Sequence, residues 1–152
     1  MHARAALRGA NVSDIRQAVT AALAGRNVGN ISVAVVDDAT IADVNERFLG
    51  KARPTDVISF DLRDDPTSGT IEGEIVVSAE TARRVAADLG LALREELLRY
   101  VIHGALHLAG WDDRTTAQRA RMRLAENRTL AALKGKPASK RAGRGRAFRR
   151  QG

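Results

Sequence analysis

The 152-residue chain contains no cysteine, and aromatic side chains make up only 3% of it. Without cysteine, neither a disulfide framework nor a metal site with thiolate ligands can form. The shortage of aromatic residues leaves few side chains on which nucleic-acid bases could stack. No apolar run approaches the ~20 residues that a membrane-spanning helix needs, and residues 1–10 do not resemble a signal peptide. These absences lead us to expect a cytoplasmic protein without a membrane partner.

Charge is distributed unevenly along the chain. There are 25 lysines and arginines against 18 aspartates and glutamates, which gives a net charge of +7. Eight of the basic residues lie within 134–152, which has no acidic residue, and subtracting them leaves 17 basic against 18 acidic residues. The high pI therefore describes this segment and does not indicate that the rest of the chain binds nucleic acid. We expect one domain at 1–133 with a hydrophobic core, followed by a basic, disordered tail at 134–152.

Hydrophobic periodicity and turn residues divide the first 133 residues into short helices and strands. The pattern predicts strands near 30–36, 57–62 and 70–77, and the last two are close enough in sequence to form a hairpin. It predicts helices near 11–24, 40–48, 78–89, 94–109 and 115–133, with Phe48, Leu89 and Leu124 among the inward residues. The expected fold class is α+β, a small mixed sheet of three or four strands packed with about five helices. Apolar residues occupy several faces of helix 94–109, which indicates that this helix is central.

The segment from His103 to Asp113 contains two of the three histidines, four positions apart. An α-helix brings positions i and i+4 to one face, so both imidazoles can point at one ion. Gly110 can end the helix because glycine adopts a positive φ at little cost. A residue just after the turn can then add a third ligand, and Asp113 has a suitable spacing. Two imidazoles, one carboxylate and an open position are typical of a catalytic zinc site, so the expected cofactor is one divalent ion, Zn²⁺.

The same spacing occurs in the metzincin helix, H-E-x-x-H-x-x-G-x-x-H/D, except at one position. Gly104 stands where the protease carries its glutamate general base, which argues against a peptidase. One alternative is an ordinary helix with two packed or exposed histidines and no metal. Asp112 has several interpretations, since it could orient His107 or a bound water, cap the last helix, or replace Asp113 as a ligand.

Four segments of the chain, in order, resemble the YbeY family of bacterial metal-dependent endoribonucleases. Residues 103–113 are similar to that family's H-G-x-L-H-L-x-G-Y-D-H motif, 54–60 to P-T-D-V-L-S-F, and 73–78 to G-D-I-x-I-S. Its final-helix pattern M-x-x-x-E-x-x-x-L-x-x-L is matched by Met122, Glu126, Leu130 and Leu133. The resemblance covers about Ile31 to Leu133. It implies a single-strand-specific endoribonuclease of rRNA maturation and ribosome quality control, with rRNA and the small ribosomal subunit as partners.

The resemblance also implies which residues form the site. His103, His107 and Asp113 would be catalytic through the metal ion, and Asp56 and Ser59 would lie at the edge of the substrate cleft. Taken alone, Asp56 has the character of a turn residue.

Two positions depart from the family pattern. Asp113 replaces the usual third histidine; a carboxylate is an accepted zinc ligand, but its charge should weaken the ion as a Lewis acid and raise the pKa of bound water. Leu49 stands where the family has an arginine before the glycine of its R-G-K-type loop. If that arginine binds a phosphate, Arg47, Lys51 and Arg53 are the nearest cations that could replace it.

These departures leave a second function open, a non-catalytic ribosome-assembly factor with a structural metal. The nucleophile also stays open. Attack by water would leave a 5′-phosphate on the downstream fragment, whereas attack by the 2′-hydroxyl of the RNA would leave a cyclic phosphate upstream. The tail at 134–152 is either a solubilising terminus or a weak electrostatic contact with rRNA.

Overall fold

The computed structural model describes residues 10–65 and 67–135. Within them the chain forms three strands and five helices, which confirms the α+β class. The elements are α1 (Val12–Ala22), β1 (Asn27–Val36), α2 (Asp38–Leu49), β2 (Val57–Asp61), β3 (Thr70–Ser78), α3 (Ala79–Leu89), α4 (Leu93–Leu108) and α5 (Thr116–Gly135). None of the described helices combines the length and the apolar character of a membrane span. The tail expected at 134–152 lies, beyond Gly135, outside the described residues.

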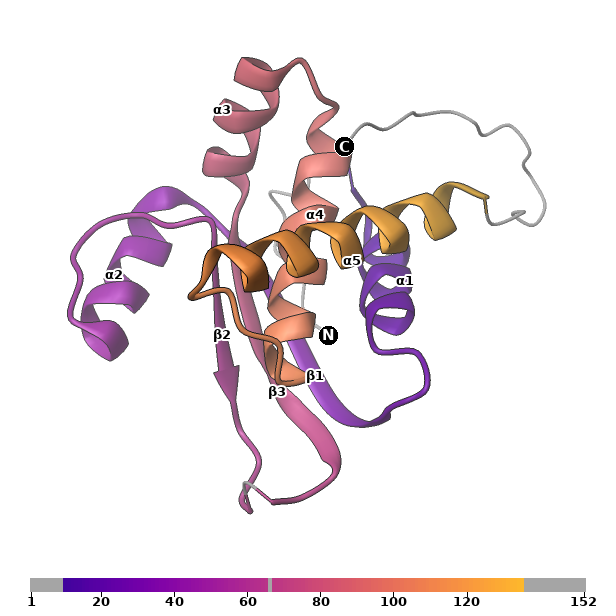
Figure 1. Cartoon of the computed structure of the whole chain (residues 1–152). Coiled ribbons are helices and arrows are strands. Elements are labelled where there is room, and N and C mark those ends of the chain that lie inside the picture. Colours follow the sequence, from indigo (N-terminus) through magenta and orange to yellow (C-terminus); the bar gives the residue numbers. More distant parts are fainter. Residues whose placement is uncertain (1–9, 66, 136–152) are drawn as a thin grey trace.

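The sheet is mixed, with β3 between the other two strands. β1 pairs parallel with β3, and β2 pairs antiparallel with it, so the predicted pairing of the second and third strands is confirmed. A parallel connection cannot be a tight turn, and here it runs through α2 and β2. Because β3 is central, β1 and β2 are the two edge strands. Figure 1 shows α2 beside it, α4 lying against the sheet and α5 crossing α4.

The strands alternate between two apolar faces of unequal size. Val33 and Ile75 belong to the main core, to which α1, α3, α4 and α5 also contribute. Ile58 and Val76 point to the opposite face, where Ile41 of α2 packs against them. Four of the described helices therefore contribute to the core on one face of the sheet, whereas α2 contributes to the other.

Helix α4 is central, as the sequence predicts, and it contacts α1, α3, α5, β2 and β3. A Cβ atom at Gly104 would lie 2.6 Å from Ile75 Cγ2, 2.9 Å from Ser59 Oγ and 3.2 Å from Val57 Cγ2. The Ser59 hydroxyl donates a hydrogen bond to the Gly104 carbonyl at 2.9 Å. The helix can approach the sheet this closely because residue 104 has no side chain. A glutamate at this position, as in the metzincin pattern, would push the helix away.

Capping side chains set the helix boundaries. Asn11 forms a capping box with Asp14 at the start of α1, and Ser78 caps α3. The helix predicted near 40–48 begins earlier, at Asp38, because Asp37 caps it; the Asp37 carboxylate accepts a hydrogen bond from the Thr40 amide at 2.8 Å.

Three residues expected to face inward are exposed, namely Phe48 (64%), Leu89 (63%) and Leu124 (54%). Leu89 is the last residue of α3, beyond the stretch that packs. Leu124 lies about 200° around the axis of α5 from the buried Met122, so the two cannot share a face. Phe48 meets only the periphery of the smaller core, where its ring contacts Phe60 edge to face with centroids 5.3 Å apart.

We expect Gly104→Ala to lower the free energy of unfolding, because the new methyl group would overlap Ile75 and Ser59. Overpacking costs about 1–3 kcal/mol, against a gain of about 1 kcal/mol from better helix propensity. Urea denaturation followed by circular dichroism measures the difference. Gly69→Ala is the matched control, because a Cβ atom there would meet nothing within 4 Å. A urea midpoint for Gly104→Ala above that of the wild type would contradict the steric argument.

Candidate metal centre

The end of α4 and the turn after it bring three potential ligands together, His103, His107 and Asp113. The two histidine Nε2 atoms lie 3.1 Å apart. Asp113 Oδ2 lies 3.3 Å from His103 Nε2 and 3.3 Å from His107 Nε2. Each of the three residues is partly buried. We call these residues the ligand triad, and they could hold a metal ion.

The spacing of these atoms fits a tetrahedral ion. With metal–ligand distances of about 2.0–2.1 Å, two ligands of tetrahedral zinc lie about 3.3 Å apart, and the triad shows 3.1, 3.3 and 3.3 Å. Two nitrogen atoms and one carboxylate oxygen also form a suitable donor set for zinc, with a fourth position left for water or substrate. Geometry and donor chemistry therefore agree on a small divalent cation.

The turn that carries Asp113 is fixed by backbone bonds and by one arginine. Gly110 has a φ of +101°, a value that few residues with a side chain adopt. Its amide donates to the His107 carbonyl at 3.0 Å, and the Trp111 amide donates to the Leu106 carbonyl at 3.0 Å. From α5, Arg119 Nη1 donates to the Asp113 carbonyl at 3.3 Å. The reversal predicted at Gly110 is therefore present.

Asp112 neither joins the ligand triad nor caps α5. Its carboxylate is exposed and lies 3.4 Å from the guanidinium of Arg114. It does not belong to the ligand triad. It does not cap α5 either, because Thr115 Oγ1 accepts from the Gln118 amide at 3.0 Å and Gln118 Oε1 accepts from the Thr115 amide at 3.0 Å. This reciprocal pair is a capping box.

Glu126 of α5 orients the first histidine. His103 Nδ1 lies 2.7 Å from Glu126 Oε2, and the Glu126 side chain is almost fully buried. A carboxylate beside Nδ1 fixes the tautomer in which Nδ1 carries the hydrogen, so that the lone pair of Nε2 points at Asp113 and His107. Carboxylates that accept from a metal-binding histidine in this way also raise its basicity as a ligand.

A buried cluster of charges lies behind Glu126. Arg99 Nη1 is 3.4 Å from Glu126 Oε1, and the same guanidinium lies 3.8 Å from Glu95 and 4.0 Å from Glu96. Arg99 Nη1 also donates to Asn127 Oδ1 at 2.9 Å. Arg99 is the buried cation of this cluster and faces three buried carboxylates, while the more exposed Arg123 lies 3.8 Å from Glu126. Burial raises the pKa of Glu96, although Tyr100, Arg99 and Arg123 act to lower it. The surroundings of the triad therefore favour additional positive charge.

The pKa of His103 reflects these surroundings. Burial alone would lower it, but the hydrogen bond and charge of Glu126, followed by the charges of Asp113 and Asp56, raise it above its ordinary value. A proton and a metal ion compete for the same Nε2 lone pair. Metal affinity should therefore fall as the pH falls through this raised pKa.

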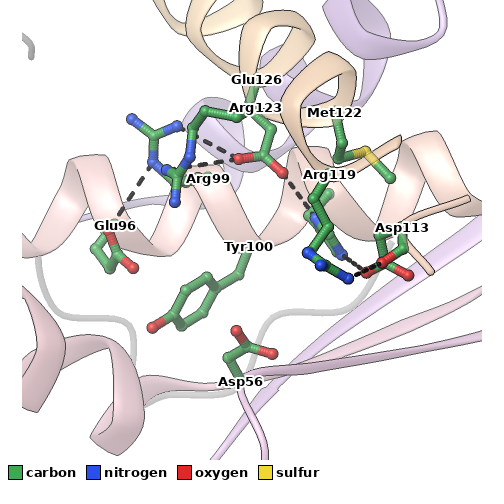
Figure 2. Close-up of a pocket in the computed structure, with 10 residues that line it drawn as sticks. Asp56, Glu96, Arg99, Tyr100, Asp113, Arg119, Met122, Arg123 and Glu126 are labelled. Carbon is green, nitrogen blue, oxygen red and sulfur yellow. Dashed lines mark hydrogen bonds and ion pairs between the residues drawn. The ribbon is translucent and has the colours of Figure 1, made fainter. Parts of the chain in front are cut away.

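Two pockets meet at the ligand triad without sharing a lining residue. The first, which we call the arginine pocket, has a volume of 260 Å³ and contains His103 and Asp113 together with Arg99, Arg119 and Arg123. Figure 2 shows these arginines around Glu126 and Asp113, above Tyr100 and Asp56. The second, the loop pocket, has a volume of 490 Å³ and lies between His107 and the 49–55 segment.

The structure distributes the predicted substrate-binding residues unequally between these pockets. Lys51, Arg53 and Ser59 line the loop pocket with His107, whereas Asp56 lines the arginine pocket. Asp56 also accepts a hydrogen bond from the next amide, of Val57, at 2.7 Å, as a turn residue does. Arg47 lines neither pocket; its exposed guanidinium lies 3.4 Å from Asp43 on the same helix.

Three further residues of the site escaped sequence reasoning as functional groups. Glu126 was recognised only as part of a helix pattern, and Arg99 and Arg119 had no assigned role. Glu126 and Arg99 act across more than 20 positions, so local spacing carries no sign of their contacts, whereas Arg119 reaches Asp113 over six positions. One signal was available, because Glu126 is the only acidic residue in α5, and a single acid in a basic and apolar helix requires a partner.

Comparison with known proteins identifies relatives of this chain. A family model described as "Endoribonuclease YbeY" matches residues 6–134. A relative of that description from Rhodopirellula baltica is 45% identical over 126 residues, covering 80% of this chain but 62% of the relative, so the chain spans less than two thirds of that protein. One from Chloroherpeton thalassium is 40% identical over 121 residues, 78% of this chain and 84% of the relative.

A solved structure supports the fold. The solution structure of a Thermotoga maritima protein matches with a TM-score of 0.55 and 24% identity, covering 89% of this chain and 91% of the other. At this identity the likeness concerns the fold alone.

We expect Asp113→Asn to weaken metal binding strongly, because an amide oxygen carries no charge and the triad would lose its anionic ligand. A calorimetric titration with Zn²⁺ measures the affinity. Asp112→Asn makes the same chemical change at the neighbouring, exposed position and should leave the affinity unchanged. The opposite order of affinities would make Asp112 the ligand.

We expect Glu126→Gln to reduce metal affinity about 10–100-fold, the usual effect of losing a partner that orients a histidine ligand. The glutamine keeps the volume of the side chain but not the charge that lies 2.7 Å from His103 Nδ1. The same titration measures the effect, and Glu46→Gln on the exposed surface of α2 is the control. An unchanged affinity would show that Glu126 does not tune the site.

Proposed function

The chain belongs to the YbeY endoribonuclease family, and we propose that it is itself a metal-dependent endoribonuclease that cleaves single-stranded RNA. The observation that carries this proposal is the ligand triad, whose three atoms lie 3.1–3.3 Å from one another at the junction of two pockets. A small divalent cation fits that spacing, and both pockets contain basic side chains that suit a phosphate backbone.

The side chains of the site can be assigned separate roles under this proposal. A bound divalent ion would supply positive charge that stabilises the phosphoryl oxygens and promotes the ionisation of water. His103, His107 and Asp113 would hold it, and Glu126 would keep the His103 ring in the required tautomer. In the loop pocket Lys51 and Arg53 would bind backbone phosphates beside His107.

The finer assignments are also part of the proposal. We propose Zn²⁺ as the ion, because two nitrogen donors and one oxygen donor suit it better than Mg²⁺ or Ca²⁺, which prefer oxygen ligands alone. We propose maturation and quality control of rRNA as the process, with the small ribosomal subunit as partner and the cytoplasm as compartment. The domain would occupy 1–133, and the basic residues of 134–152 would add a weak contact with rRNA.

A second candidate is a non-catalytic ribosome-assembly factor with a structural metal. The favouring observation is the arrangement of the ligands, because an ion bound by His103, His107 and Asp113 would also tie the α4–α5 connection to α4. Leu49 in place of the family arginine also favours this candidate, because the loop pocket then has an apolar residue where a cation could have bound a phosphate.

The test compares the purified wild type with Asp113→Ala. Metal content is measured by mass spectrometry, and cleavage of single-stranded RNA is assayed on the same samples. The expected result is about one metal ion per chain with cleavage, and the loss of both in the variant, because the triad loses a ligand. A 5′-phosphate on the downstream product would identify water as the nucleophile, and a cyclic phosphate upstream would identify the 2′-hydroxyl.

The two candidates differ in what metal removal does. For an enzyme, His107→Ala should abolish turnover and leave RNA binding. For an assembly factor, the same change and chelation of the metal should chiefly lower the melting temperature. Bound metal without cleavage would favour the assembly factor, and a metal-free native protein would overturn both the site and the mechanism.

A further inference from the structure

The arginine pocket, which shares no lining residue with the loop pocket, has a cationic rim formed by α5. Arg119 and Arg123 both come from α5, one helical turn apart, and both line the pocket that contains His103 and Asp113. Residues four apart on a helix are neighbours on its surface, with about 5–6 Å between their Cβ atoms. The two guanidinium groups therefore form one local patch beside the ligand triad.

The two arginines differ in how far the protein engages them. Arg119 donates to the carbonyls of Asp113 at 3.3 Å and Arg114 at 3.2 Å, so it supports the turn that carries a ligand. Arg123 is 58% exposed, and Glu126 lies 3.8 Å away, near the limit of an ion pair. The carboxylate of Glu126 already accepts from His103 and Arg99 at shorter distances. The internal contacts of the site therefore depend little on Arg123.

The acidic residues of this pocket do not cancel that charge. Asp113 belongs to the triad, and Glu126 and Glu96 are buried against Arg99. Asp56 is the exposed carboxylate among the described lining residues. With a divalent ion in the triad, the open part of the pocket would have an excess of positive charge, which suits an anion and repels a cation.

We propose that Arg123 binds a backbone phosphate of single-stranded RNA on the far side of the metal centre from Lys51 and Arg53. This inference rests on the proposed function. The triad is divided between two pockets, His107 in one and His103 with Asp113 in the other. A strand that crosses the ion would therefore pass through both. The guanidinium fork of arginine matches two phosphate oxygens at once, which an extended chain would offer at each step.

The phosphate contact is recognised by charge and carries no base specificity. It would fix the direction in which the strand leaves the ion, as the cations of the loop pocket fix the direction in which it arrives. A strand engaged on both sides would place one phosphodiester at the triad. Arg123 would then be a substrate-positioning residue and would not touch the reacting atoms.

The test compares Arg123→Gln with Arg121→Gln in the metal-loaded protein. Arg121 is also exposed on α5 but lies about 160° around the helix axis from Arg123. Both variants lose one positive charge, so any general electrostatic effect is shared. The anisotropy of a labelled oligouridine gives the dissociation constant at several salt concentrations. Gels on the same samples follow cleavage, and mass spectrometry gives the metal content.

We expect Arg123→Gln to bind the oligouridine several-fold more weakly and to lower the slope of log K against log salt by about 0.7, the value for one phosphate contact on a single strand. Arg121→Gln should match the wild type in both, and Arg123→Lys should restore most of the slope because it keeps the charge. Metal content should be the same in all four proteins.

Contrary outcomes separate this inference from the proposed function. Equal slopes for Arg123→Gln and Arg121→Gln in a cleaving protein would overturn the phosphate contact and leave the endoribonuclease proposal in place. Loss of metal in Arg123→Gln would overturn it too, because the arginine would then act through Glu126. A wild type that binds the oligouridine without cutting it would refute the nuclease, while the slopes would still decide on Arg123. Absence of binding by the wild type would overturn both.

Discussion

The position of the ligand triad depends on how closely α4 can approach the sheet. At Gly104 the helix is so near β2 and β3 that an added Cβ atom would lie within 3.2 Å of three side chains. The hydrogen bond from Ser59 to the carbonyl of the same residue fixes the helix along the strand. His103 and His107 flank this contact on α4, so the packing that builds the core also positions the two imidazoles, one in each pocket.

The same helix carries an unusual amount of buried charge. Arg99 faces Glu95, Glu96 and Glu126, and every one of these side chains is almost fully buried. Burying charge is expensive unless it is paired, and here one buried guanidinium faces three carboxylates, with the more exposed Arg123 3.8 Å from one of them. Glu95 Oε2 and Arg99 Nε have no hydrogen-bond partner among the described residues. Such a cluster is a poor source of stability. The cluster leaves negative potential beside His103, and a cation bound there would lower the free-energy cost of burying the carboxylates.

His103 and His107 have the spacing of a metzincin helix, but Gly104 replaces the glutamate base of that helix. The packing of α4 on the sheet accounts for this difference. Histidines four apart followed by a glycine turn are the least that a helix needs to offer two ligands and return a third. A general base after the first histidine requires open space at that position. Here that position faces Ile75, Ser59 and Val57, so packing excludes a large side chain before any selection for chemistry. The helix therefore has the spacing of potential metal ligands but no room for the glutamate of the metzincin pattern.

By itself the sequence determined the features that depend on residues near one another in the chain. These include the α+β class, most helix boundaries, the reversal at Gly110 and the grouping of His103, His107 and Asp113. Periodicity and turn chemistry act over a few residues, so they can be read directly. The start of α2 was predicted two residues late, because Asp37 and Thr40 are both good capping residues and only the backbone decides between them.

Tertiary structure alone decided the contacts between distant segments. Glu126 meets His103 across 23 positions, and Arg99 meets Asn127 across 28. It also assigned Lys51 and Arg53 to the loop pocket while leaving Arg47 outside both pockets. Side-chain charge is visible in a sequence, but which charges share a cavity follows from the packing of α5 on α4, a property of the whole fold.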